Sequence, residues 1–186
     1  MTVKIDEFSQ QFLGSKDVQV HQGQTADKTK LERMREQYLI QEAAEFGDII
    51  TNYIANHPRI DPTQRAFGLT LSILNLRHAY PAGTDLFDDL ADQGGKDLQI
   101  SATPVPDAAN APATRLSDAA EETAAQFSEL LTKYVTMKKN QLGTSNYQTA
   151  YGLGRAFHNL RSLYPSGPDV FDTYAAQAGE YFARNA

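Results

Sequence analysis

The chain has 186 residues, of which 41% are hydrophobic and 22% are charged, and this composition is typical of a globular protein with its own core. Its formal net charge of −6 disfavours general binding to nucleic acid, because an acidic surface repels phosphate backbones. The absence of cysteine excludes disulfides, thiolate metal sites and a cysteine nucleophile.

The first 27 residues are polar, and we expect them to form a partly flexible arm. Within the arm, Ile5, Phe8, Phe12 and Leu13 have helical spacing, which predicts one short helix. The region lacks the apolar core of a signal peptide, and no run of ~18 apolar residues occurs in the chain. We therefore expect a cytoplasmic protein without a membrane-spanning segment.

Residues 28–98 are expected to form a first unit of three helices. Thr29 and Glu32 have the spacing of a capping box, which predicts the start of the first helix. Asp61 and Gln64 predict a second capping box, with a proline at the first helical position. A third helix is expected at about 85–98.

Residues 99–113 are rich in alanine and proline, and this composition indicates a linker. The following residues, 114–186, are expected to form a second unit. Ser117 is expected to cap its first helix, and the spacing of Ser145 and Gln148 predicts a capping box for its second. Its last helix is expected at about 169–183.

The two units resemble each other in sequence. Residues 64–97 align with residues 148–181 without a gap, at an offset of 84, and 16 of the 34 aligned positions are identical. Self-similarity at a fixed offset is the mark of a duplicated supersecondary unit. The sequence therefore predicts an all-α protein, built as a tandem duplication of a three-helix unit and packed as one helical bundle about a pseudo-twofold axis.

Several positions shared by the two stretches indicate packing. Apolar residues step by four, three and four along the middle helix of each unit, which predicts a buried face. Gly68 and its counterpart Gly152 lie inside these helices, where glycine costs about 1 kcal/mol relative to alanine. We expect each glycine to allow a close helix crossing, either within a unit or between the units.

The shared charged residues allow two interpretations. Arg77 and Arg161 end the middle helices, a short turn away from two shared pairs of acids, Asp85/Asp169 and Asp88/Asp172. One interpretation is a local arginine–aspartate bridge that closes each turn. The other is a duplicated site in which the arginines bind an anion, because guanidinium suits carboxylate and phosphate recognition.

The differences between the units indicate where a partner or ligand could bind. Leu71, Leu74 and His78 share one face of the first middle helix, and their counterparts are Arg155, His158 and Ser162. The apolar face either packs inside the protein or docks a partner. The polar face, with Arg77 and Arg161, supplies the candidate anion-binding residues, which are Arg77, Arg155, His158 and Arg161.

No motif for catalysis or for a cofactor is found. Glu42, Glu45 and Asp48 step by three along one helix, but no Glu-x-x-His motif accompanies them, so no metal site is predicted. The sequence favours a non-catalytic protein that binds another protein or itself, as an adaptor, an inhibitor or an immunity-type protein does. The alternative is a small-molecule-binding or anion-binding protein, or an enzyme, with its site between the two repeats.

Overall fold

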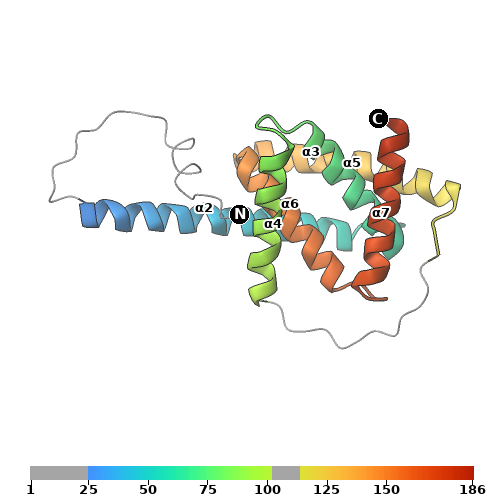
Figure 1. Cartoon of the computed structure of the whole chain (residues 1–186), viewed down its shortest axis with the longest axis horizontal. Coiled ribbons are helices and arrows are strands. Elements are labelled where there is room, and N and C mark those ends of the chain that lie inside the picture. Colours follow the sequence, from blue (N-terminus) through green and yellow to red (C-terminus); the bar gives the residue numbers. More distant parts are fainter. Residues whose placement is uncertain (1–24, 102–113) are drawn as a thin grey trace. The chain divides into compact units, whose positions relative to one another are not determined.

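The computed structural model describes residues 25–101 and 114–186, and every regular element in these ranges is an α-helix (Figure 1). The prediction of an all-α protein is therefore confirmed. The helices are α2 (Thr25–Ala55), α3 (Pro62–His78), α4 (Thr84–Ser101), α5 (Asp118–Leu142), α6 (Asn146–Ser162) and α7 (Pro168–Asn185). The chain divides into two compact units, Met1–Ile40 and Gln41–Ala186, and the division falls inside α2.

Three of the predicted helix starts are confirmed. The side chain of Asp61 accepts hydrogen bonds from the backbone of α3, and Gln64 bonds back to the backbone of Asp61. Ser145 and Gln148 form the same reciprocal box at α6. Ser117 caps α5 through the backbone N–H of Ala120 at 3.4 Å. Each cap satisfies donors that the first turn of a helix leaves without a partner.

Two expected boundaries differ from the structure. Helix α2 begins at Thr25, so Thr29 lies inside the helix and does not cap it. The residues between them, alanine, aspartate and lysine, are tolerated in a first helical turn, and they let the helix start earlier. Helix α4 continues to Ser101, into the predicted linker. The short helix predicted at residues 5–13 and the linker residues 102–113 lie outside the described residues.

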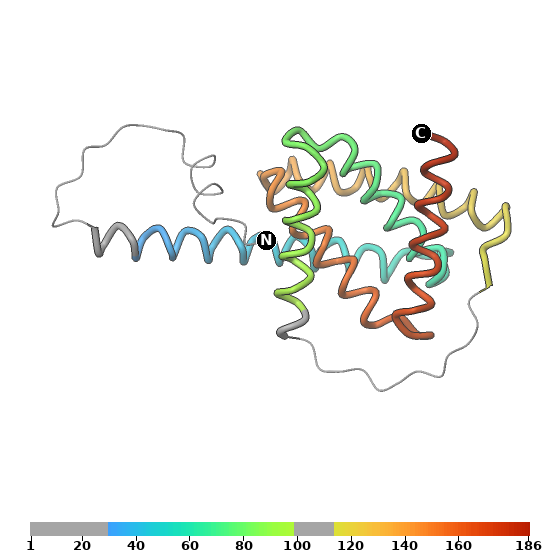
Figure 2. Tube along the Cα trace, viewed as in Figure 1, coloured from blue at the N-terminus to red at the C-terminus, as the bar shows by residue number. Residues whose placement is uncertain are grey.

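Within the unit Gln41–Ala186, helices from both halves of the sequence build one core. Helix α3 packs against α5 and α7, and α6 packs against α4. In the view of Figures 1 and 2, α6 crosses α4, and α7 lies to the right of α4. The main buried cluster contains Phe46, Ile50, Ile54, Leu69, Phe87, Phe127, Leu131, Val135 and Leu153. Full burial of a side chain as large as valine, leucine, isoleucine or phenylalanine contributes about 2 kcal/mol to stability.

The two shared glycines lie at close crossings between helices of different halves. A Cβ on Gly68 of α3 would lie 2.6 Å from the ring of Phe127 on α5. A Cβ on Gly152 of α6 would lie 2.9 Å from the ring of Phe46 on α2. The close crossings predicted for these glycines are therefore present, and both join the first half of the chain to the second.

A further close crossing joins α6 to α4. A Cβ on Gly154 would lie 2.0 Å from the carbonyl oxygen of Ala91, and a Cβ on Gly94 would lie 2.2 Å from that of Tyr151. The two helices therefore touch through their backbones. The phenol of Tyr151 donates to Asp97 at 2.6 Å across the same contact.

Candidate functional site

Arg77 and Arg161 each bind an aspartate near the start of the helix that follows them. Arg77 donates to the two carboxylate oxygens of Asp88, from Nε at 2.7 Å and from Nη2 at 2.8 Å. Arg161 makes the same two bonds to Asp172, both at 2.7 Å. These hydrogen bonds raise the pKa of each guanidinium, and bidentate pairs of this kind fix geometry as well as charge. The local bridges that the sequence leaves as one alternative are present at both turns.

Arg155 also has a carboxylate partner. Its Nε lies 3.2 Å from Oδ1 of Asp48, and this ion pair joins α6 to α2. All three arginines among the candidate anion-binding residues are thus paired, so an anion would have to compete with a carboxylate at each of them. Anion binding by these residues stays a prediction.

His158, the fourth of these candidates, is half-buried where α6 meets α4. A Cβ on Gly95 would lie 2.2 Å from Cδ2 of the imidazole, so the ring rests against the backbone of α4. Burial lowers the pKa of His158 below its ordinary value of 6.5, and the charge of Arg161 lowers it further. Asp92 and Asp172 act in the opposite direction. The imidazole of His158 therefore stays neutral down to a lower pH than the imidazole of a histidine in water.

The lowered pKa of His158 predicts a loss of stability in mild acid. Below its ordinary pKa of 6.5, the unfolded chain binds a proton that the folded protein resists, so stability falls with the pH until the folded-state pKa is passed. The urea midpoint of the wild type should be lower at about pH 5.5 than at about pH 7.5. His158→Gln should reduce this difference. An equal difference in both proteins would contradict the role assigned to His158.

The candidate partner-binding residues lie on a face of α3 that α7 covers in part. Leu71 is only 6% exposed and belongs to a buried cluster with Ala178 of α7. Leu74 is half-buried and His78 is exposed. The ring of His78 lies 6.2 Å from that of Phe182 on α7. Leu71 is thus part of the core, which supports internal packing at this position. Partner binding through Leu74 and His78 stays a prediction.

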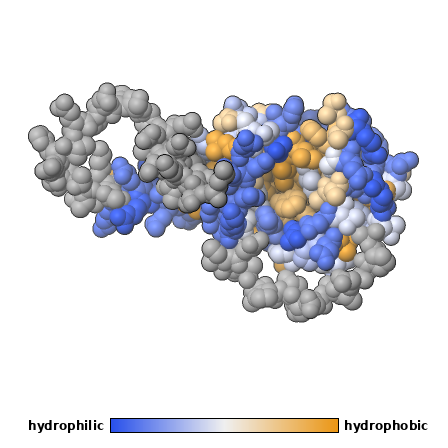
Figure 3. Space-filling model, viewed as in Figure 1, coloured by the Kyte–Doolittle hydropathy of each residue, from blue (hydrophilic) through white to orange (hydrophobic). Residues whose placement is uncertain are grey.

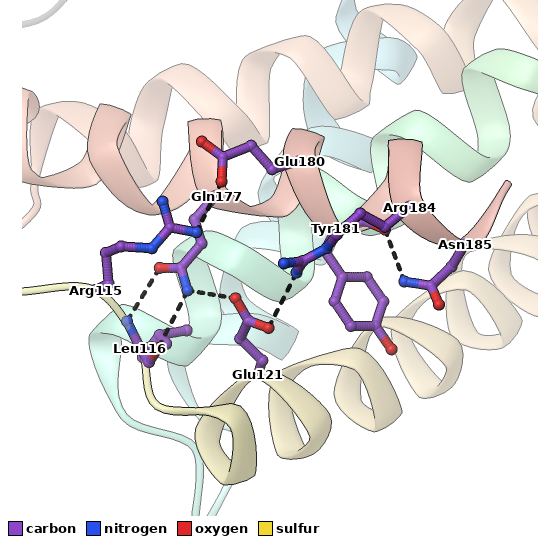
Figure 4. Close-up of polar contacts among 8 residues, drawn as sticks. All are labelled: Arg115, Leu116, Glu121, Gln177, Glu180, Tyr181, Arg184 and Asn185. Carbon is purple, nitrogen blue, oxygen red and sulfur yellow. Dashed lines mark hydrogen bonds and ion pairs between the residues drawn. The ribbon is translucent and has the colours of Figure 1, made fainter.

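A buried polar network joins α7 to the start of α5 (Figure 4). The amide of buried Gln177 accepts a hydrogen bond from the backbone N–H of Leu116 at 3.0 Å and donates to the carbonyl of Leu116 at 3.2 Å. It also donates to the carboxylate of buried Glu121 at 2.5 Å. Arg184 donates to the same carboxylate at 3.2 Å. Glu121 is therefore an acceptor in the interior rather than a solvated charge at a helix start.

Sequence comparison of the two units marks Gln93 and Gln177 as a shared pair that could form buried hydrogen bonds, but it did not identify Leu116 and Glu121 as the partners of Gln177. Gln93 aligns with Gln177, but Gln93 is exposed and donates to Asp97 on its own helix at 2.8 Å. The difference arises because Leu116 precedes the cap of α5, so its backbone groups are not used by the helix and remain available to Gln177. The sequence carries no signal that distinguishes the two glutamines.

An exposed apolar surface lies beside two stacked tyrosines. Tyr53 of α2 and Tyr134 of α5 stack with 3.8 Å between ring centroids, and burial raises the pKa of each phenol. One helical turn to either side of Tyr134, Leu130 is 50% exposed and Met137 is 44% exposed. The ammonium of Lys138 lies 5.8 Å from the centroid of the Tyr134 ring. These five residues form the tyrosine-stack surface.

A second apolar area is visible in Figure 3, between α4 and α7 and over α3 and α6. Hydrophilic residues surround it in this view. Helices α3, α4 and α6 contribute partly buried apolar side chains that pack against the main core, among them Ile73, Leu90, Phe157 and Leu160.

The described residues contain no group of three or more histidine, aspartate or glutamate side chains that could hold a metal ion. Within the same ranges, no helix is both long and apolar enough to cross a membrane. Comparisons with protein-family models, with curated proteins and with solved structures found no match for this chain.

Proposed function

We propose that this chain is a non-catalytic protein of the adaptor, inhibitor or immunity type that binds another protein through the tyrosine-stack surface. The observation that carries the proposal is the exposure of Leu130 and Met137 on one face of α5, beside Tyr134. Large apolar side chains grouped on a surface mark interaction sites, and stacked aromatic rings offer a rigid area at low entropic cost. The three arginines among the anion-binding candidates, in contrast, are already paired with carboxylates of the protein.

The charges around this surface favour an acidic partner. Lys133 is exposed one turn from both Leu130 and Met137, and Lys138 lies over the ring of Tyr134. The two lysines are positively charged, whereas the net charge of the whole chain is −6. A partner helix with apolar residues at its centre and acidic residues at its edges would match both properties.

The proposal predicts a crosslink at Leu130. A photo-crosslinking residue at this position, in the full chain and in lysate of the native host, should give one discrete protein adduct. Met137→Glu should remove the adduct, because it places a carboxylate in the apolar centre of the surface. Met137 is exposed on a helix, so this substitution should change stability by less than about 0.5 kcal/mol.

Leu163 supplies the matched control for this experiment, because it is a leucine that is at least as exposed, at the end of α6. The same crosslinker at Leu163 should give no adduct of that mass. An adduct that forms equally at both positions, or that persists in Met137→Glu, would contradict the proposal. An adduct of twice the mass of the chain would identify the partner as a second copy.

The alternative, a small-molecule or anion site between the repeats, is supported by one observation. His158 is half-buried beside the Arg161–Asp172 ion pair, near Asp92 of α4. Such a ligand would bind the folded state and raise the melting temperature. A rise with phosphate, sulfate or small carboxylates that is lost in His158→Gln would favour this alternative.

We infer further that the chain is a tandem duplication whose two repeats are related by a pseudo-twofold axis. In support, Gly68 of α3 crosses α5 closely while its counterpart Gly152 of α6 crosses α2. Tyr53 and Tyr134 occupy corresponding places in the two repeats, and they stack on each other. A twofold axis brings a residue next to its own counterpart, as this stack requires.

A further inference from the structure

The middle helix of each half of the unit Gln41–Ala186 packs mainly on helices of the other half. The first half is residues 41–101 and the second half is residues 114–186. Helix α3 packs on α5 and α7, and α6 packs on α4, whereas the packing of α3 on α4 and of α6 on α7 is much less extensive. Each half therefore supplies most of the surroundings of the other half's middle helix.

The buried clusters also combine residues of both halves. The main cluster joins Phe46 and Leu69 of the first half to Phe127 and Leu131 of the second, and all four are at most 1% exposed. The two smaller clusters likewise contain residues from either side of the 102–113 gap. A half of about 70 residues is small for a stable core of its own. Separation of the halves would expose side chains that each half cannot bury alone.

Close backbone contacts and hydrogen bonds fix how the halves fit together. A Cβ on Gly47 of α2 would lie 2.7 Å from the carbonyl oxygen of Gly152 on α6, so these two helices also approach through their backbones. Three side-chain hydrogen bonds cross between the halves, and they join Gln148 to Glu42 at 3.0 Å, Tyr151 to Asp97 at 2.6 Å and Ser72 to Thr132 at 2.8 Å. An apolar contact with this close fit resembles the interface of an obligate complex, which is built like a domain core cut in two.

We propose that the two halves are obligate binding partners, which stay bound to each other when the chain between them is cut. The tyrosine stack pairs Tyr53 of the first half with Tyr134 of the second, so the tyrosine-stack surface is complete only in the assembled pair. The pairing does not depend on the function proposed for that surface, because its test measures assembly of the halves and not capture of a partner.

A cleavable full chain tests the pairing. A protease site within a flexible glycine–serine segment is inserted between Asp107 and Ala108, outside the described ranges, and the folded protein is cut. The cut protein should elute from gel filtration as one particle, at the volume of the uncut chain. Its urea midpoint should rise with protein concentration, because unfolding then releases two chains, whereas the midpoint of the uncut chain should not change. Halves that elute separately, or that each keep their helical circular dichroism after separation, would overturn the proposal.

Gly94→Ala tests whether the crossing of α4 with α6 holds the halves together. The added Cβ would lie 2.2 Å from the carbonyl oxygen of Tyr151 in the other half, so the affinity between the cut halves should fall about tenfold. The uncut Gly94→Ala chain should keep its helical signal, since the covalent connection gives an effective concentration on the order of millimolar. Gly179→Ala is the matched control, because its Cβ has no neighbour within 4 Å, and it should not weaken the affinity. Equal affinities in the two cut variants would contradict the pairing through this crossing.

Discussion

Replacing Gly154 by alanine is expected to lower the free energy of unfolding by about 3 kcal/mol. The added Cβ would lie 2.0 Å from the carbonyl oxygen of Ala91 and 2.4 Å from its Cα. Backbone atoms cannot rotate away as the end of a side chain can, so α4 and α6 would have to separate. The separation would also strain the hydrogen bond from Tyr151 to Asp97. Urea denaturation should show a lower midpoint with an unchanged slope.

Gly179 supplies the matched control for this prediction. It lies inside α7, and a Cβ built on it has no neighbour within 4 Å. Alanine favours a helix by about 1 kcal/mol over glycine, so Gly179→Ala should raise stability. The two glycine-to-alanine substitutions are thus expected to have opposite signs. A loss of stability in both would show that the close contact of Gly154 with Ala91 is not the cause.

Local rules predicted much of the fold correctly. The caps at Asp61, Ser117 and Ser145 depend on residues within one helical turn, and all three are present. The close crossings at Gly68 and Gly152 could be predicted because a glycine inside a helix needs a packing reason. The start of α2 could not, since several residues before Thr29 also tolerate a helical turn.

The identity of the neighbouring helix could not be read from the sequence. Leu71 and Arg155 occupy corresponding positions, yet Leu71 packs in a core cluster with Ala178 of α7 while Arg155 binds Asp48 of α2. Both interpretations of the Leu71 face, packing and docking, require the same apolar spacing. Only the position of α7 decides between them. The sequence also did not predict the tyrosine-stack surface. Tyr53 is half-buried because it stacks on Tyr134 of α5, and the sequence does not show that α5 is its neighbour.

Gln177→Leu is expected to cost about 3 kcal/mol, because it removes a buried amide from a network that includes a carboxylate. Leucine fills a similar volume but leaves Glu121 buried with Arg184 as its remaining side-chain partner. It also leaves the two backbone groups of Leu116 without the amide that they bind. Chemical denaturation at neutral pH measures the loss. Gln93→Leu, at the aligned but exposed position, should change stability by less than about 0.5 kcal/mol.

A double variant separates the hydrogen bonds from the volume that Gln177 fills. If the cost arises from leaving the carboxylate of Glu121 buried with too few partners, Gln177→Leu/Glu121→Leu should be more stable than Gln177→Leu alone, because no buried charge remains. Removing both partners of a buried polar pair costs less than removing one. A double variant that loses the sum of the two single effects would show that the residues act independently. The cost of Gln177→Leu would then arise from packing and from the two hydrogen bonds to Leu116, and not from the bond to Glu121.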